Sequence, residues 1–238
     1  MIPCISVENM RRSDEYTIAN FVPSLTLMHR AAMGVYLAHR WSGPVAIAAG
    51  SGNNGGDGFA LACILAGKGI PCTVFTLSSR LSPDSAHYAA LAKAAGVAVL
   101  PYTPGCLTGF AEVVDCLLGT GFQGSLRDAY RAALDEINAS GAFVISVDIN
   151  SGMNGDTGLS EIAVHSQLTV TIGYVKNGLI TEAAGSYMKR LVCADIGIHL
   201  LREENRLCTR EEWQERAGEP GVFLAPDWLE MQPIRADF

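Results

Sequence analysis

The segment VAIAAGSGNNGGDGFALA, residues 45–62, decides the fold. Its first part, Val45–Gly50, is a short apolar run that predicts a buried strand, and Phe59–Gly69 predicts a helix that ends at glycine. Between them Gly50, Gly52 and Gly55 form a G-x-G-x-x-G turn. Glycines there let the backbone approach a pyrophosphate, while the helix N-terminus supplies N–H groups. The segment predicts a phosphate-binding turn, and a tight turn without a ligand is the alternative.

The alternation of strands and helices continues on both sides of this turn. Further strands are expected at Cys72–Leu77, Val97–Leu100, Glu112–Leu118, Ala142–Val147, Leu168–Gly173 and Leu191–Ala194. Helices are expected from about Met10 to Pro23, from a Ser24 cap to about Arg40, at Pro83–Ala95 and at Ser125–Ser140. Apolar strands that alternate with helices predict an α/β protein whose parallel sheet has helices on both faces.

Composition excludes several classes of protein. Of the 238 residues, 49% are hydrophobic and only 17% are charged, which excludes a disordered chain. The net charge of -7 argues against a nucleic-acid partner. No apolar run approaches the roughly 18 residues of a membrane span, so no membrane partner is expected. The seven cysteines form no C-x-x-C pair and the N-terminus lacks the apolar core of a signal peptide, which indicates reduced thiols and a cytoplasmic protein.

The glycine-rich turn differs from that of an ordinary dinucleotide dehydrogenase. Such an enzyme carries an acidic residue at the end of its second strand, where this chain reads Thr76-Leu77-Ser78-Ser79-Arg80. The chain also has neither G-x-x-x-x-G-K-[ST] nor G-x-S-x-G, which argues against a P-loop and against an α/β-hydrolase nucleophile.

Two further polar turns follow later strands. Asp115 lies inside the apolar run VVDCLL and needs a cation, hydrogen-bond donors or a raised pKa. Gly119, Gly121 and Gly124 then form a second anion-binding turn. Asp148 ends the next strand, where it suits acid–base work or caps a turn, and Ser151 follows. Because ligands bind at the carboxyl ends of parallel strands, Asn54, Asp115 and Ser151 could offer oxygens to one hard cation there.

The motifs together resemble a known family. GSGNNGGDGFALA, VVDCLLGTGFQG, DINSG and QLTVTIGYVKNGL occur in the order found in NAD(P)H-hydrate epimerases, also called the YjeF N-terminal domain family. The resemblance runs from about Met10 to Ile198. It implies a three-layer α/β/α Rossmann-like sandwich with a mainly parallel sheet, a homodimer and a bound potassium ion. The implied activity interconverts the epimers of hydrated NADH and NADPH, alongside a separate dehydratase.

The resemblance also implies a role for individual residues. Those implied to contact the hydrated dinucleotide are Asn53, Asn54, Gly55, Gly56, Asp57, Gly119, Thr120, Gly121, Phe122, Gln123, Gly124 and Ser125. Asn54, Asp115 and Ser151 are implied to bind potassium, and Asp148 to face the altered ring as the catalytic acid–base. Lys176 is expected to support the site or to contact a phosphate.

The chain departs from the family pattern at several places. Ser51 and Asn150 stand where prolines are usual, and Gln123 where many members carry a basic residue. The change at Asn150 is expected to loosen its turn. We expect one domain over residues 1–200 and a helix with an arm over 201–238. The roughly forty residues after Ile198 are expected to be too few for a dehydratase domain. The rival interpretations are a non-catalytic nucleotide-binding or scaffold module and another enzyme on a Rossmann-like fold.

Overall fold

A computed structural model describes residues 1–122, 124 and 126–235. Its centre is an eight-stranded sheet in which all neighbouring strands are parallel. In spatial order the strands are β12 (Ile234–Arg235), β9 (Leu191–Asp195), β7 (Leu168–Ile172), β6 (Phe143–Val147), β5 (Glu112–Cys116), β2 (Val45–Ala49), β3 (Cys72–Thr76) and β4 (Ala98–Pro101). The predicted parallel sheet is confirmed.

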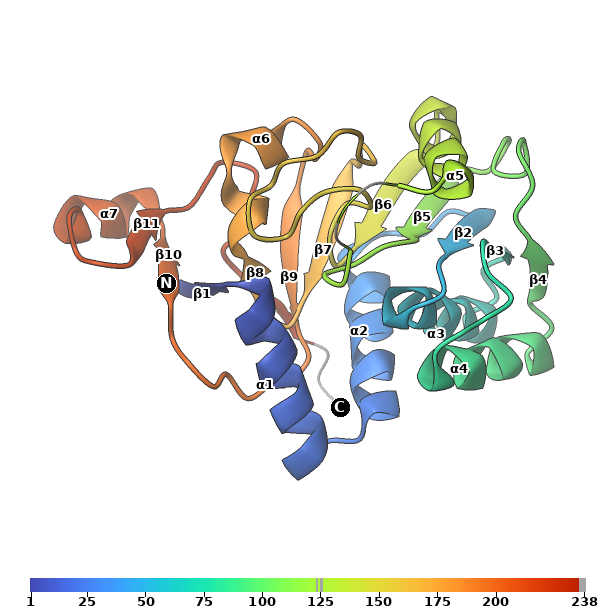
Figure 1. The fold of residues 1–238 in the computed structure, drawn as a ribbon, viewed down its shortest axis with the longest axis horizontal. Coiled ribbons are helices and arrows are strands. Elements are labelled where there is room, and N and C mark those ends of the chain that lie inside the picture. Colours follow the sequence, from blue (N-terminus) through green and yellow to red (C-terminus); the bar gives the residue numbers. More distant parts are fainter. Residues whose placement is uncertain (123, 125, 236–238) are drawn as a thin grey trace.

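Helices cover both faces of the sheet (Figure 1). One face carries α2 (Ser24–Ala38), α3 (Asn53–Gly67) and α4 (Pro83–Ala94), and the other carries α5 (Asp128–Ala139). Successive residues of β5 point to opposite faces. Val114 packs with the α3 residue Phe59, whereas Val113 packs with Leu134 of α5. The sandwich therefore has the three layers that the resemblance implied.

A second, smaller sheet lies beside the first. Its order is β11 (Val222–Leu224), β10 (Asn205–Cys208), β1 (Ile2–Ile5) and β8 (Val175–Lys176). Strand β1 was not predicted, because four residues are too few to display an alternating pattern. It pairs antiparallel with β10 and parallel with β8. The tail contains the expected helix as α7 (Arg210–Arg216), but its strands also join both sheets of this chain.

Three helix boundaries differ from the sequence-based predictions. Helix α1 (Val7–Asn20) begins earlier than expected, with Ser6 as its N-cap. Ser24 is not a cap, since Pro23 occupies that position and no side-chain hydrogen bond caps α2. Helix α3 begins at Asn53 rather than Phe59 because close packing overrides the poor helix propensity of its glycines.

Short segments complete the chain between β8 and β9. They are a 3-10 helix, η1 (Asn177–Ile180), and a single turn, α6 (Glu182–Gly185). Among the described residues, no helix is long and apolar enough to cross a bilayer.

Candidate active site

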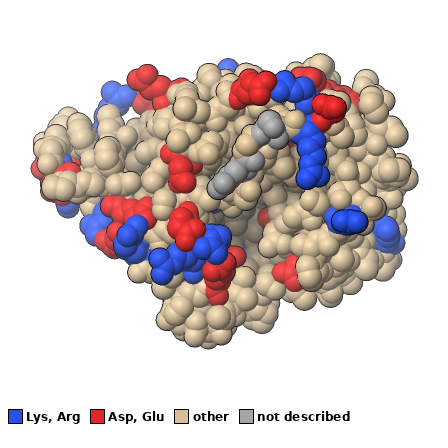
Figure 2. Space-filling model, in the orientation of Figure 1, with Lys and Arg blue, Asp and Glu red and all other residues tan. Residues whose placement is uncertain are grey.

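A cavity of about 750 Å³ lies at the carboxyl ends of the central strands. The turn after β2, the loop after β5 and the residue after β6 all contribute to it, and α1 and α2 complete its walls. The three polar turns found in the sequence therefore meet at one place. Lys, Arg, Asp and Glu are interspersed on the face shown in Figure 2 rather than gathered by sign. The cavity, not a charged surface, is where the polar motifs converge.

The first glycine-rich turn contributes only part of its length to the cavity. Asn53, Asn54 and Asp57 line it, whereas Gly55 and Gly56 are buried behind it. A Cβ on Gly55 would lie 2.2 Å from the carbonyl oxygen of Gly50. Gly55 is therefore required by the approach of two backbone segments, and its role does not need a ligand.

The second glycine-rich loop lies close to Asp148. Gly119, Thr120, Gly121 and Phe122 line the cavity, while Gly124 lines a separate hollow. Gln123 and Ser125 lie outside the described residues. A Cβ on Gly119 would come within 3.0 Å of Asp148 Oδ2, so a larger residue there would press on the carboxylate.

Asp148 is held in the cavity by a buried lysine. Its φ of 69° lies in the left-handed region, which no other described non-glycine residue adopts. Lys176 Nζ donates to Asp148 Oδ1 at 2.5 Å, and also to Thr171 Oγ1 at 3.1 Å and the Ile172 carbonyl at 2.6 Å. The lysine side chain is 1% exposed and the aspartate 13%. Lys176 therefore fixes one carboxylate oxygen, while from the described residues Oδ2 receives only a long bond of 3.3 Å, from the Thr120 N–H.

Asp115 is satisfied by hydrogen bonds within the protein. Oδ1 accepts from Ser151 Oγ at 2.5 Å and the Leu117 N–H at 3.3 Å. Oδ2 accepts from Ser146 Oγ and the Ser151 N–H, both at 2.9 Å. Burial raises the pKa of Asp115, and these hydrogen bonds lower it in part. Of the three explanations that the sequence left open, donors and a raised pKa are both present.

Two of the three residues implied to bind potassium contact one backbone group, and the third, Asp115, bonds to one of them, Ser151. Asn54 Nδ2 and Ser151 Oγ lie 3.0 Å and 3.2 Å from the Leu118 carbonyl oxygen. Asn54 Oδ1 is buried and has no hydrogen-bond partner among the described residues. A buried, unpaired amide oxygen is a ligand that suits a hard cation. The described residues include no group of three His, Cys, Asp or Glu side chains that could hold a metal.

Two further carboxylates face the same cavity. Burial and the nearby charge of Asp148 raise the pKa of Asp57 well above its ordinary value, and they raise that of Asp14 as well. The sequence analysis missed Asp14. Its signal was the helical spacing of Val7, Met10 and Asp14, which places them on one face of α1, and all three line the cavity.

Asn150 holds the turn between Asp148 and Ser151. Its Nδ2 donates to the carbonyls of Val164 and Tyr187 and to Ser166 Oγ, at 2.8–3.1 Å. Its Oδ1 accepts from Thr169 Oγ1 at 2.6 Å. The expectation of a loosened turn is therefore wrong, because a fully buried side chain supplies the restraint that a proline ring would give.

Comparison with known proteins places the chain in a family. The model of the YjeF-related protein N-terminus matches residues 24–178. The chain belongs to this family. The NAD(P)H-hydrate epimerase of Limosilactobacillus fermentum is 35% identical over 199 residues, which are 80% of this chain and 95% of that protein. The bifunctional NAD(P)H-hydrate repair enzyme Nnr of Coxiella burnetii is 31% identical over 79% of this chain and 40% of its own length.

A solved structure shows the same fold. The crystal structure of the yeast protein YNL200c superposes with a TM-score of 0.69 at 20% identity, covering 85% of this chain and 96% of the yeast chain. The three-layer fold that the resemblance implied is thus confirmed.

Proposed function

We propose that this protein interconverts the R and S epimers of hydrated NADH and NADPH. The observation that carries the proposal is the match to family members named NAD(P)H-hydrate epimerase over nearly their whole length. The geometry supports it, since a carboxylate and a buried lysine face a cavity at the carboxyl ends of a parallel sheet. The protein is then an isomerase that repairs damaged nicotinamide nucleotides.

The reaction requires loss and return of water at one ring carbon. We assign Asp148 as the group that takes a proton from Lys176 Nζ, 2.5 Å from its Oδ1, and gives one to the hydroxyl as the C–O bond breaks; the same transfers in reverse return the proton to Lys176 after water has added. The lone pair of the ring nitrogen forms a planar iminium. Water then adds to the other face and returns a proton to Asp148. Between the two steps the carboxylate charge stabilises the cation, and nothing is oxidised or reduced.

The two glycine-rich turns are proposed to bind the dinucleotide. Helix α3 begins at the cavity, and its N-cap, Gly52, leaves the first turn without a side-chain cap. The positive end of the helix dipole therefore faces any phosphate placed there. Asn53, Asn54 and Asp57, together with the loop from Gly119 to Ser125, make the contacts in this proposal. Gly55 and Gly56 contribute by allowing the turn to pack.

A potassium ion is proposed at Asn54, Asp115 and Ser151. In support, Asn54 Oδ1 is buried and unpaired. Both oxygens of Asp115 already accept two hydrogen bonds each, which uses the roughly four lone-pair positions of a carboxylate. Ser151 Oγ lies 3.2 Å from the Leu118 carbonyl, so turning its hydroxyl toward that oxygen frees a position on Asp115. A bound cation would supply positive charge beside the first glycine-rich turn.

The potassium proposal predicts a difference between two salts. Replacing sodium by potassium should raise the Tm of the wild-type protein, since a ligand that binds only the folded state stabilises it. Asn54→Ala should abolish that difference. Equal salt effects on the two proteins would contradict the assignment.

We further propose a cytoplasmic homodimer that works beside a separate dehydratase. All seven cysteines are free thiols, in keeping with a reducing compartment. The Coxiella relative is named bifunctional and this chain matches 40% of it, which supports a second enzyme acting on the same damaged nucleotides.

A coupled assay tests the function. The epimer that a known dehydratase does not consume is supplied with that dehydratase, with and without this protein. We expect rapid consumption only when this protein is present. A folded protein that gives no acceleration over the spontaneous rate would favour the rival interpretation, a non-catalytic binding or scaffold module.

A further inference from the structure

Helix α1 presents two different faces. One lines the cavity with Val7, Met10 and Asp14. The other is a polar stripe on which Asn9, Ser13 and Thr17 recur every fourth residue, and these three are 6%, 0% and 0% exposed. Buried polar side chains need hydrogen-bond partners. What covers this stripe therefore determines where the cavity face of α1 lies.

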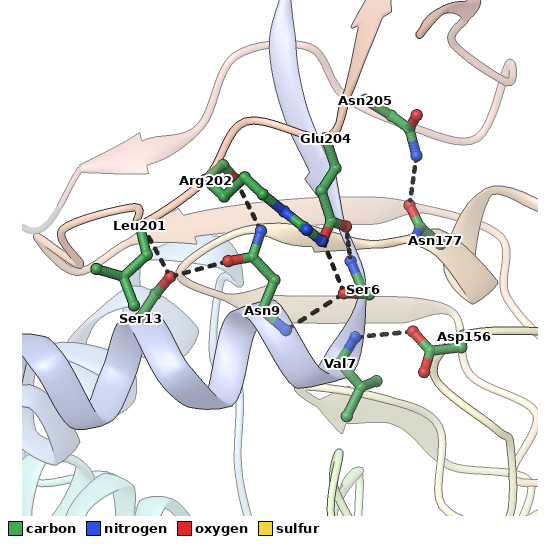
Figure 3. A network of polar contacts seen from close by, with 10 residues as sticks. All are labelled: Ser6, Val7, Asn9, Ser13, Asp156, Asn177, Leu201, Arg202, Glu204 and Asn205. Atoms are coloured by element: carbon green, nitrogen blue, oxygen red, sulfur yellow. Dashed lines mark hydrogen bonds and ion pairs between the residues drawn. The ribbon is translucent and has the colours of Figure 1, made fainter.

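The stripe is covered by residues 199–205, which we call the C-terminal strap. Strap backbone N–H groups donate to the helix: that of His199 to Thr17 Oγ1 at 2.9 Å and that of Leu201 to Ser13 Oγ at 3.1 Å. In the other direction, Asn9 Nδ2 donates to the Arg202 carbonyl at 2.7 Å. Figure 3 shows the part of this ladder from Ser13 to Ser6. The strap and the helix run in opposite directions along these contacts.

Glu204 fastens the strap to the start of α1 (Figure 3). Its Oε2 accepts from the Ser6 N–H at 2.6 Å, and its Oε1 accepts from Ser6 Oγ at 3.0 Å and Arg202 Nη2 at 2.6 Å. Burial would raise the pKa of Glu204, but the hydrogen bonds from Arg202 and Ser6 hold it below its ordinary value. Beside it, Asp156 Oδ1 accepts from the Val7 N–H at 2.7 Å. Two carboxylates from distant segments thus fix the N-terminus of α1.

We propose that Glu204 is a positioning residue for substrate binding: through Ser6 and the strap it holds the cavity face of α1 against the hydrated dinucleotide. This inference rests on the proposed function. Glu204 does not line the cavity among the described residues, so its effect passes through the helix. The ammonium group of Lys176 is also held by Thr171 Oγ1 and the Ile172 carbonyl of β7, which lie outside the strap. Loosening α1 therefore weakens binding in ground and transition states alike.

Glu204→Ala tests the proposal, with Glu203→Gln as the matched control. Glu203 is the neighbouring residue, its side chain is 66% exposed, and its ion pair is with Arg206 rather than with α1. We expect Glu204→Ala to raise KM for hydrated NADPH about tenfold while kcat stays within about twofold. Glu204→Gln, which keeps one acceptor oxygen for Ser6, should give a smaller rise. Glu203→Gln should leave both constants unchanged.

Hydrogen exchange gives a second readout that does not depend on activity. The amides of α1 should exchange at least about tenfold faster in Glu204→Ala than in the control, whereas those of α3 should not change. A merely structural role would lower Tm without moving KM. An unchanged KM, or a fall in kcat alone, overturns the proposal.

The two proposals fail in different ways. If neither wild type nor the control epimerises the substrate, the proposed function fails, and the exchange rates together with the affinity for hydrated NADPH still test the positioning. Should Glu204→Ala fail to fold, Glu204→Gln takes its place, and its KM and the exchange rates of α1 should still rise above those of Glu203→Gln, by less than is expected for Glu204→Ala.

Discussion

Two aspartates at the carboxyl ends of neighbouring strands, one fully buried and one partly buried, show how differently this fold uses one side chain. Asp115 lies within β5 and Asp148 directly follows β6, where Ser146 pairs in register with Asp115. Asp115 accepts four hydrogen bonds from uncharged donors and is fully buried. Asp148 lines the cavity and has a lysine on one oxygen, while its other oxygen accepts a hydrogen bond of 3.3 Å from the Thr120 N–H.

The two carboxylates differ in how many of their acceptor positions are already used by hydrogen bonds. The hydrogen bonds of Asp115 tie the ends of β5 and β6 to the Ser151 turn, so its first role is to hold the site together. Asp148 combines an unusual backbone conformation, a charged partner and a nearly free oxygen. Such features collect at reactive positions. Three changes of single residues sharpen this contrast.

The largest effect is expected at Asp148. Asp148→Asn should lower turnover about a hundredfold or more, because the amide cannot exchange a proton with the departing hydroxyl. Asparagine is chosen because it tolerates a positive φ. Time courses of epimer conversion measure the turnover, and a binding assay with hydrated NADPH shows whether the variant still binds its substrate. Near-normal turnover would remove Asp148 from the chemistry.

The second effect is a loss of stability at Asp115. Asp115→Asn replaces one acceptor oxygen by an NH₂ group, which leaves the Ser151 N–H or the Leu117 N–H without its partner. We expect a loss of about 2 kcal/mol in the free energy of unfolding. Urea unfolding of this variant beside Asp148→Asn measures the contrast. An unchanged free energy of unfolding in Asp115→Asn would contradict the structural role given to Asp115.

The smallest effect is a gain in stability at Asp57. Its raised pKa means that stability is fully present below the unfolded pKa of about 3.9 and is lost as the pH rises through the folded pKa. Asp57→Asn should therefore be more stable than wild type at pH 7, where the wild-type carboxyl carries the cost of ionising in a buried place. The gain should vanish below about pH 4.

Unfolding curves at several pH values check the Asp57 prediction. Asp135→Asn, on the exposed surface of α5, is the control and should show no such gain. A variant less stable than wild type at pH 7 would contradict the account of a carboxylate held in the cavity at a cost in stability.

The sequence predicted the sheet and the meeting of its polar turns well. Apolar strands such as Val45–Ala49 carry a strong local signal, and parallel pairing then brings their carboxyl ends together. It suggested that Lys176 supports the site or contacts a phosphate, but it did not predict the ion pair with Asp148, because the two-residue strand of Lys176 has no periodicity and its partner lies 28 positions away. A buried ion pair between distant segments leaves no local pattern.

The sequence also did not predict the contacts between the N-terminal helix and the C-terminal strap. The polar stripe of Asn9, Ser13 and Thr17 looks like an ordinary solvent-facing surface of a helix, and only the fold shows that the strap covers it. Asp57 and Asp148 were found because they follow strands within glycine-rich motifs. Asp14 was not, because it lies on a helix before the first strand of the main sheet.

The most direct test of the central claim follows the oxygen atom of the substrate. Hydrated NADPH of one configuration is incubated with the protein in ¹⁸O-labelled water, and inversion and label are measured together. Loss and return of water at Asp148 predicts one labelled oxygen for each inverted molecule, and almost no inversion or label above background with Asp148→Asn. Inversion without uptake of the label would contradict it, as would equal uptake with the Asp148→Asn variant.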